Sequence, residues 1–215
     1  MIKKIALGGF LFLLLAFVGL HFYFYFAAKN ALQDAKNESS ALLLGNPQGD
    51  LLVVSFIDYQ CPHCPTLNSV LEKTLPSEPE VKLLLRPVAW MGQTSEDIAA
   101  LVLGSREQGK AAALHKQIME EANPPSYTRA KELAANLGID VKKAEDAALA
   151  AGLRPLIQKN STIAVDIGLR SVPSLLIGSM PYTPPPEGMP GVNELRLLFD
   201  EARAKSSSPS PKTEE

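Results

Sequence analysis

The sequence predicts an α/β fold in which helices pack against a central sheet. Three short apolar segments have the composition of buried strands, and segments with helical periodicity separate and follow them. The order is strand, helix, strand, helical block, strand, helix, the alternation from which layered α/β domains are built. A long apolar segment precedes this domain, and a pair of cysteines directly follows the first strand.

The three predicted strands are bounded by residues that interrupt regular structure. Leu51–Ile57 is a dense run of Leu, Val, Phe and Ile that follows Gly49-Asp50. Val81–Pro87 ends at its own proline, and Ser174–Ile177 begins directly after Pro173. Short continuous apolar runs of this kind are typical of strands that are buried on both faces.

Helical spacing predicts the elements between and after the strands. A helix is expected to begin at Cys61, with its apolar face formed by Leu67, Val70, Leu71 and Leu75. Residues 95–151 are expected to form several helices, with Ser95 as a cap and breaks near Pro124-Pro125 and residues 137–140. A closing helix is expected over Val192–Ala204.

The N-terminal segment has the pattern of a membrane span. Lys3 and Lys4 precede an uncharged apolar run, Ile5–Ala28, that is long enough to cross a hydrocarbon core of roughly 30 Å. The positive-inside rule then keeps the N-terminus in the cytoplasm and exports the rest. Residues 1–28 are therefore expected to be a transmembrane signal-anchor. A cleaved signal peptide is the alternative, although the run is longer than usual and no small-residue cleavage site stands out. Either segment delivers the chain to an oxidising compartment.

The segments that flank the domain are polar. Residues 29–44 are expected to form a stalk, and a role of this stalk in pairing two protomers into a homodimer stays open. Residues 205–215 are rich in Ser, Pro and charge and are expected to be a disordered tail. The net charge of -2 provides no basic patch, so the composition argues against a nucleic-acid partner.

The chain has two cysteines, and both lie in the sequence Cys61-Pro62-His63-Cys64. This spacing allows the thiols to close a disulfide or to open to a dithiol. A cysteine at a helix start is stabilised as a thiolate by free N–H groups and by the helix dipole. Cys61 is therefore expected to be the exposed attacking sulfur and Cys64 the buried resolving one. His63 could add a donor or a positive charge beside Cys61, and Pro62 suits the first helical turn.

The same spacing also occurs in half of a zinc site. The other histidines, His21 and His115, have no plausible ligand spacing to the cysteines, so no metal is expected. His115 is expected to be an ordinary helix-face residue. Trp90 and Met91 follow the second strand and are expected to pack in the core, with a groove beside the active site as the alternative.

Two motifs resemble the DsbA-like thiol-disulfide oxidoreductases, in particular their periplasmic copper-resistance-type branch. Phe56–Cys64 is similar to the family's active-site strand and helix start, and Gly168–Gly178 is similar to its cis-proline loop. The resemblance implies a thioredoxin-like central sheet with an inserted helical subdomain, at about residues 94–160 of a domain over residues 45–204. It also implies that Pro173 is cis and that Val172 pairs with a substrate strand beside Cys61.

The chain departs from the family pattern at three places. Many relatives carry a buried glutamate six residues before the first cysteine, where this chain has Ser55. Asp58 is the nearest remaining carboxylate, and it is either a proton relay or a solvated or capping residue. Pro65 directly after Cys64 is unusual. The proline-rich loop over residues 181–190 is expected to be a stiff surface loop or a partner-docking element.

The sequence thus predicts a thiol-disulfide oxidoreductase in the bacterial inner membrane, with a single span and a periplasmic catalytic domain. It needs no cofactor, since the dithiol itself carries the electrons. Exported proteins with cysteines are the expected substrates, and the resemblance implies a quinone-coupled membrane partner. The Cys-Pro-His-Cys sequence favours an oxidase; a reductase or isomerase fed by a membrane electron donor stays open. A non-catalytic binding or chaperone module is the alternative from another class.

Overall fold

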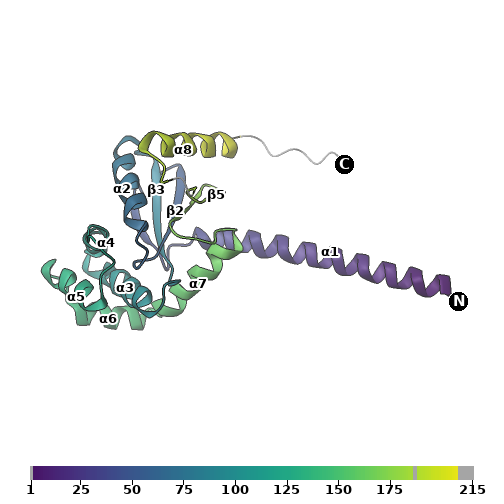
Figure 1. The fold of residues 1–215 in the computed structure, drawn as a ribbon, viewed down its shortest axis with the longest axis horizontal. Coiled ribbons are helices and arrows are strands. Elements are labelled where there is room, and N and C mark those ends of the chain that lie inside the picture. Colours follow the sequence, from purple (N-terminus) through teal and green to yellow (C-terminus); the bar gives the residue numbers. More distant parts are fainter. Residues whose placement is uncertain (1, 186–187, 208–215) are drawn as a thin grey trace.

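The computed structural model describes the backbone of residues 2–185 and 188–207. The side chains of residues 2–13 and of Phe24 lie outside the described part. Figure 1 shows a sheet flanked by helices, a group of helices at one end of it, and a long N-terminal helix that leads away from the domain. The arrangement is the α/β fold that the order of elements predicts.

A five-stranded sheet has the order β1-β3-β2-β4-β5. The strands are β1 Leu42–Gly45, β2 Leu51–Ile57, β3 Val81–Pro87, β4 Ser174–Ile177 and β5 Met180–Tyr182. The pair β2 and β3 is parallel, with Leu51 opposite Val81 and Ile57 opposite Pro87, whereas the other pairs are antiparallel. The three predicted strands are confirmed with the bounds expected for them.

The two edge strands were not expected from the sequence. β1 pairs with β3, and its first three residues, Leu42–Leu44, belong to the predicted stalk, which therefore contributes to the sheet of the domain. β5 begins the proline-rich loop and includes Pro181, which pairs with Leu176. A proline is tolerated there because an edge strand leaves one side of its backbone without a partner strand. Residues 186 and 187 of the proline-rich loop lie outside the described residues.

The helices form one group on the sheet and one at its end. Their bounds are α1 Ile2–Ala35, α2 Cys64–Thr74, α3 Gln93–Gly104, α4 Ala111–Met119, α5 Tyr127–Asn136, α6 Val141–Ala150, α7 Leu153–Asp166 and α8 Val192–Ser207. Short 3₁₀ turns follow α2 and α3. The helical insertion expected at about residues 94–160 corresponds to α3–α7. α8 extends into the expected tail, and residues 208–215 lie outside the described part.

Capping residues explain the start of the middle helices. Ser126 accepts a hydrogen bond from the Arg129 N–H at the start of α5, and Asp140 does the same for Lys143 in α6. Each side chain satisfies a backbone donor that the helix leaves free. Ser95, expected to be a cap, lies instead inside the first turn of α3, and its hydroxyl donates to Asp58.

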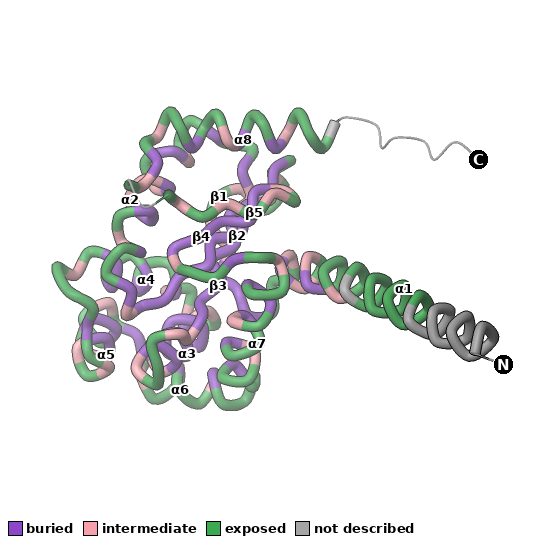
Figure 2. The backbone as a smooth tube through the Cα atoms, turned by 45° about the vertical axis from the view of Figure 1, so that its right-hand side comes forward, coloured by how far each residue is buried: buried purple, intermediate pink, exposed green. Residues whose placement is uncertain are grey.

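The middle strands of the sheet are mostly buried (Figure 2). Three clusters of buried residues join these layers. One face of the sheet packs against α2 and α8 through residues such as Val53, Leu71 and Phe199. The other face packs against α7 and the end of α1 through Phe56, Ile163 and Ala35. The third cluster fills the helical insertion and reaches Ile57, Tyr59, Cys61, Cys64 and Leu85 at the end of the sheet. The cysteines therefore lie at the junction of the sheet and the insertion.

α1 differs from the rest in its exposure. Leu14, Phe17, Tyr23 and other large apolar side chains along its described part are exposed, whereas Ala31 and Ala35 are buried against the domain. Among the residues that the structure describes, no helix combines the length and the apolar character needed to cross a membrane. The span predicted over residues 1–28 includes residues 1–13 and Phe24, whose side chains lie outside the described part.

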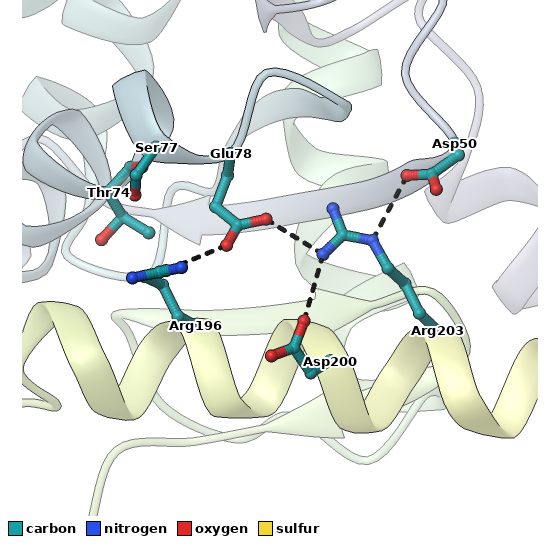
Figure 3. A network of polar contacts seen from close by, with 7 residues as sticks. All are labelled: Asp50, Thr74, Ser77, Glu78, Arg196, Asp200 and Arg203. Carbon is teal, nitrogen blue, oxygen red and sulfur yellow. Dashed lines mark hydrogen bonds and ion pairs between the residues drawn. The ribbon is translucent and has the colours of Figure 1, made fainter.

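A charged network holds α8 at the end of the sheet opposite the cysteines (Figure 3). Glu78 lies just before β3, and its side chain is 8% exposed. Its two carboxylate oxygens accept hydrogen bonds from Arg196 Nε at 3.2 Å and from Arg203 at 2.9 Å. Arg203 also contacts Asp50 at 3.4 Å and Asp200 at 3.5 Å. One buried carboxylate thus joins the sheet to two turns of α8.

Candidate active site

The two cysteines lie at the transition from β2 to α2, and both are free thiols. The Cys61 N–H donates to the Asp58 carbonyl at 3.0 Å, and the Cys64 N–H donates to the Cys61 carbonyl at 3.3 Å. These successive turns delay the helix, so α2 begins at Cys64 and not at Cys61 as the sequence predicted. Pro65, and not Pro62, occupies the first helical turn, where its missing N–H leaves no bond unmade.

The Cys61 sulfur is stabilised as a thiolate although it lies before the helix. A hydrogen bond from the Cys64 thiol, with further bonds from the backbone N–H groups of His63 and Cys64, lowers the pKa of Cys61 to about 6. Burial and the negative charge of Asp58 oppose this shift and raise the pKa. The donors prevail, as expected at the free N–H groups of a helix N-terminus. At neutral pH the Cys61 side chain is therefore largely in its nucleophilic thiolate form.

Cys64 has the opposite environment. Its side chain is completely buried. Burial is the main cause that raises the pKa of Cys64, and the neighbouring Cys61 raises it further. Cys64 is therefore a protonated thiol that donates to the Cys61 thiolate. This asymmetry gives one sulfur that can attack and one that can resolve a mixed disulfide once it loses its proton.

Cys61 is less accessible than the sequence suggested. The residue is 2% exposed, whereas Pro62 and His63 beside it are exposed. Its sulfur lies 3.5 Å from the Val172 carbonyl oxygen, so the loop before β4 covers it. A small cleft of about 80 Å³ opens beside it. This cleft is lined by Tyr59, Cys61, Pro62, Pro65, Ile118, Met119 and residues 121–125.

The loop that covers Cys61 contains the predicted cis-proline. The Val172–Pro173 peptide bond is cis, as the resemblance implied. The Val172 carbonyl is the polar group of this loop that contacts the attacking sulfur. Residues 61 and 172 are far apart in the sequence, and the sheet brings them together because β2 and β4 are neighbours.

The donor that His63 provides beside Cys61 is its backbone N–H, and a positive charge from its side chain stays a prediction. Its imidazole is exposed, and it provides no side-chain cap for α2 although it occupies the N-cap position. It is the backbone N–H of His63 that stabilises the Cys61 thiolate. Any residue other than proline could supply this donor.

Asp58 is buried and is not the solvated residue that one interpretation expected. Its carboxylate accepts hydrogen bonds from the Gln60 N–H at 2.8 Å, the Ser95 hydroxyl at 2.5 Å and the Met91 N–H at 3.0 Å. These bonds join the cysteine loop to the loop before α3 and to the first turn of α3. Asp58 thus caps the turn that presents Cys61, and the three hydrogen bonds to its carboxylate come from neutral donors.

Ser55 lies in β2 between Val53 and Ile57, on the face of the strand that packs against α2 and the insertion. Its hydroxyl is buried and has no hydrogen-bond partner among the described residues. Ser55 has no ionisable group, so it cannot replace the glutamate found in relatives as a proton carrier.

Trp90 is half-buried and packs against the α7 side of the sheet, and Met91 is exposed.

A buried polar pair beside the cysteines was not identified from the sequence. Tyr59 Oη lies 3.2 Å from Nδ1 of His115, and His115 Nε2 lies 2.9 Å from Asn68 Oδ1. His115 is 2% exposed. A signal for its burial was present, since His115 shares a helical face with Ala111, Leu114 and Ile118, all of them buried. Its contact with Tyr59 depends on how α4 packs against the cysteine loop.

Comparisons with known proteins agree with this geometry. The family model for the DSBA-like thioredoxin domain matches residues 52–198. A thioredoxin-like oxidoreductase from Silicibacter pomeroyi DSS-3 superposes with a TM-score of 0.71 at 27% identity, covering 79% of this chain and 94% of its own. No curated protein matches the chain significantly.

Two further solved structures share the fold. The catalytic domain of Proteus mirabilis ScsC has a TM-score of 0.71 at 22% identity, covering 83% of this chain and 97% of its own. The thiol-disulfide exchange protein alpha-DsbA2 from Wolbachia pipientis has a TM-score of 0.68 at 22% identity, covering 81% and 95% respectively.

Proposed function

Because the chain belongs to the DsbA-like thioredoxin-domain family and is a thiol-disulfide oxidoreductase, we propose that it acts as a disulfide oxidase on the cysteines of exported proteins. The observation that carries this proposal is the difference between its two thiols. Hydrogen bonds lower the pKa of Cys61 to about 6, whereas burial raises the pKa of Cys64. Stabilisation of the Cys61 thiolate favours the dithiol over the disulfide, so the Cys61–Cys64 disulfide is a good oxidant.

The proposed reaction has two exchange steps. A substrate thiolate attacks Cys61 Sγ of the disulfide, the Cys61–Cys64 bond breaks, and Cys64 leaves with the bonding electrons and takes up a proton. A second substrate thiolate then attacks the substrate sulfur of the mixed disulfide and expels the Cys61 thiolate. The substrate gains one disulfide and loses two electrons, which the enzyme holds as its dithiol. The proposed use of Val172 and Pro173 is to hold the substrate backbone beside Cys61.

The dithiol must then be reoxidised. We infer that a quinone-coupled membrane partner accepts the two electrons, since disulfide exchange with a partner returns the chain to the oxidised form without a cofactor of its own. Membrane attachment through residues 1–28 would keep the domain near that partner. This attachment rests on the apolar run Ile5–Ala28. Recovery of the chain in alkali-washed membranes would support the anchor, and a soluble, shortened chain would indicate cleavage.

The reverse direction is supported by one specific observation. The charge of Asp58 raises the pKa of both cysteines and so disfavours the Cys61 thiolate. A less stable thiolate makes the dithiol a better electron donor, as a reductase or isomerase requires. The balance between the helix N–H groups and Asp58 therefore decides the direction of electron flow.

The test is the reduction potential of the Cys61–Cys64 pair, measured on the detergent-solubilised chain by equilibration with glutathione. A value near about −120 mV would support the oxidase, and a value near about −270 mV would support the reductase. Failure to form the disulfide would overturn both and favour a non-catalytic binding or chaperone module. A Cys64→Ala chain expressed in a bacterial periplasm should accumulate mixed disulfides with its substrates, and a Cys61→Ala chain provides the matched control that cannot form them.

A further inference from the structure

The cleft beside Cys61 is built mainly from apolar groups. Four of its lining residues are prolines, which have no backbone N–H: Pro62, Pro65, Pro124 and Pro125. Ile118 and Met119, at the end of α4, add buried aliphatic side chains. A charged group that entered this cleft would lose hydration and find few donors in return, whereas an apolar side chain needs none. The lining therefore favours an apolar occupant.

The polar side chains at the cleft already have partners. The Tyr59 hydroxyl lies 3.2 Å from His115 Nδ1. The Glu121 carboxylate accepts hydrogen bonds from Nε of Arg129 at 3.0 Å and from its terminal nitrogen at 2.9 Å. The charge of Glu121 is thus paired with a cation inside the protein. A cationic side chain from a substrate would have to compete with Arg129 for it.

Gln60 fixes the width of the cleft. It directly precedes Cys61, and its side-chain Nε2 donates to the Pro125 carbonyl at 2.8 Å. Its own backbone N–H donates to the Asp58 carboxylate at 2.8 Å, so the side chain extends from an anchored turn. The cleft is lined by this cysteine turn and by residues 121–125 between α4 and α5. The bond from Gln60 to Pro125 therefore holds two of its walls at a fixed separation.

The cleft has the size of a small aliphatic side chain. An apolar cavity of about 150 Å³ holds a benzene molecule. In proportion, the cleft volume of about 80 Å³ holds about three carbon atoms. Three carbon atoms make up the side chain of valine, whereas an aromatic ring needs about twice that space.

An extended substrate would direct only some of its side chains toward the cleft. The Val172 carbonyl lies 3.5 Å from the Cys61 sulfur, and in the proposed function this loop holds the substrate backbone. Side chains of an extended segment alternate between two faces, so the residues two positions before and after the reacting cysteine share its face. Since Cys61 itself lines the cleft, a side chain at one of these two positions lies close to it.

We propose that this cleft is a subsite for a valine-sized aliphatic side chain two positions from the reacting cysteine of the substrate, and that Gln60 is the positioning residue that sets its size limit. The inference rests on the proposed exchange function and names the class of substrate that the active site prefers. Aromatic side chains are excluded while the bond from Gln60 to Pro125 holds the walls in place. Charged side chains are disfavoured because entry removes their hydration.

The experiment uses the reduced, detergent-solubilised chain and glycine peptides with a central cysteine. Each peptide carries one variable residue two positions before the cysteine and the same residue two positions after it, and an aromatic thiol is attached to the cysteine as a disulfide. The Cys61 thiolate attacks the peptide sulfur and forms a mixed disulfide with it. The peptide–aromatic S–S bond breaks, and the coloured aromatic thiolate leaves with the bonding electrons, because it is the better leaving group.

The release rate of the coloured thiol then reports the preference of the cleft. The valine peptide should react about tenfold faster than the glycine peptide, as expected for burial of a few carbon atoms. The phenylalanine peptide should react more slowly than the valine peptide, and the aspartate peptide no faster than the glycine peptide. A phenylalanine peptide that reacts faster than the valine peptide would overturn the size limit.

A substitution of Gln60 tests its role in setting the width. Gln60→Ala removes the bond to Pro125, so the valine-to-glycine rate ratio should fall to about twofold and the phenylalanine peptide should gain on the valine peptide. Gln93→Ala is the matched control, since its amide bonds Asp97 at 3.0 Å within α3, and it should keep the wild-type ratio. An unchanged ratio in Gln60→Ala, or an equal fall in Gln93→Ala, would overturn the role of Gln60.

A second variant tests whether the substrate side chain reaches the cleft. Arg129→Ala leaves the Glu121 carboxylate without its cationic partner. A lysine peptide should then gain up to about fivefold on the valine peptide, and less in high salt. An unchanged lysine-to-valine ratio would overturn the placement of the substrate side chain beside Glu121.

The wild-type chain separates failure of the subsite from failure of the exchange function. Equal rates for the glycine and valine peptides would overturn the subsite and leave the exchange function in place. Absence of coloured thiol with every peptide would instead contradict the proposed exchange function itself.

Discussion

Two buried carboxylates lie at opposite ends of the parallel strands and are satisfied in different ways. Asp58 follows β2 and accepts only neutral donors, two backbone N–H groups and the Ser95 hydroxyl. Glu78 precedes β3 and accepts from two arginines of α8. The negative charge of Glu78 is therefore compensated by the two arginines, whereas the negative charge of Asp58 has no cationic partner among its hydrogen-bond donors and acts on the cysteines.

This difference reflects what each end of the sheet has to do. The ion pairs of Glu78 with Arg196 and Arg203 fix α8 on the sheet, and because their charges compensate each other they have little electrostatic effect on other groups. At the cysteine end, Asp58 and the backbone N–H groups at the start of α2 act on sulfurs whose charge changes during exchange. One end is arranged for stability and the other for a change of protonation. Substitutions at the two ends should therefore separate stability from reactivity.

The largest effect expected is acid destabilisation through His115. Its pKa is lowered from 6.5 to about 3 in the folded chain. Between pH 6.5 and pH 3, His115 is therefore protonated in the unfolded chain and neutral in the folded chain. Stability is fully present above about pH 6.5 and is lost as the pH falls toward 3, by on the order of 4 kcal/mol. Urea unfolding at several pH values should show this loss. His115→Gln should flatten the curve in that window, and an unchanged slope would contradict the assignment.

The next largest effect is a loss of stability at the Glu78 end of the sheet. Glu78→Gln removes the charge that holds Arg196 and Arg203, and it should lower the free energy of unfolding by about 2 kcal/mol, less in high salt because both arginines are partly exposed. Exchange rates should not change. Asp146→Asn breaks the exposed pair with Lys142 and should cost no more than about 0.5 kcal/mol. Slower thiol-disulfide exchange in the Glu78→Gln variant would contradict the prediction that this end of the sheet affects stability alone.

Asp58→Asn tests the field at the cysteines. The uncharged side chain no longer raises the pKa of Cys61, so that pKa should fall below about 6, as measured by the pH dependence of Cys61 alkylation. The amide NH₂ would also face one of the three donors, which should cost about 1 to 3 kcal/mol of stability. A rise in the pKa of Cys61 would show that the bonds made by Asp58 matter more than its charge.

The smallest effect is expected at Ser55. Its buried hydroxyl has no partner among the described residues, so Ser55→Ala should leave stability unchanged or raise it by up to about 1 kcal/mol in thermal unfolding. Ser174 is the matched control, since its hydroxyl is bonded to the Ser171 carbonyl at 2.7 Å and to Thr183 at 2.9 Å. Ser174→Ala should cost about 1 kcal/mol. Equal losses in both variants would indicate a partner for Ser55.

The sequence predicts the parts of this molecule that depend on local pattern. Continuous apolar runs predict β2, β3 and β4 with their bounds, and the cysteine spacing predicts the redox pair. The edge strands β1 and β5 escape prediction because they are short, and pairing with a neighbour defines them more than composition does. An α/β fold is thus predictable from its buried strands alone.

The site is predictable in its sulfur chemistry and less so in its surroundings. The turn from Asp58 to Cys64 shifts the helix start by three residues, and its hydrogen bonds depend on Met91 and Ser95 from a distant segment. The loop before β4, which is also distant in the sequence, covers Cys61. The Tyr59–His115 contact joins residues 56 positions apart. Such contacts follow from tertiary packing, and a sequence pattern shows only that His115 shares an apolar helical face.

Arg86 in β3 determines where the domain can be cut. Its guanidinium is 1% exposed and donates to the backbone carbonyls of Asp34 and Asn37, to Ser40 and to Asn160. A recombinant fragment that starts at Ala41 would remove three of these four acceptors and leave a buried cation largely unsatisfied. Fragments for crystallisation or potentiometry should therefore begin upstream of Ala31, so that the last turns of α1 travel with the catalytic domain.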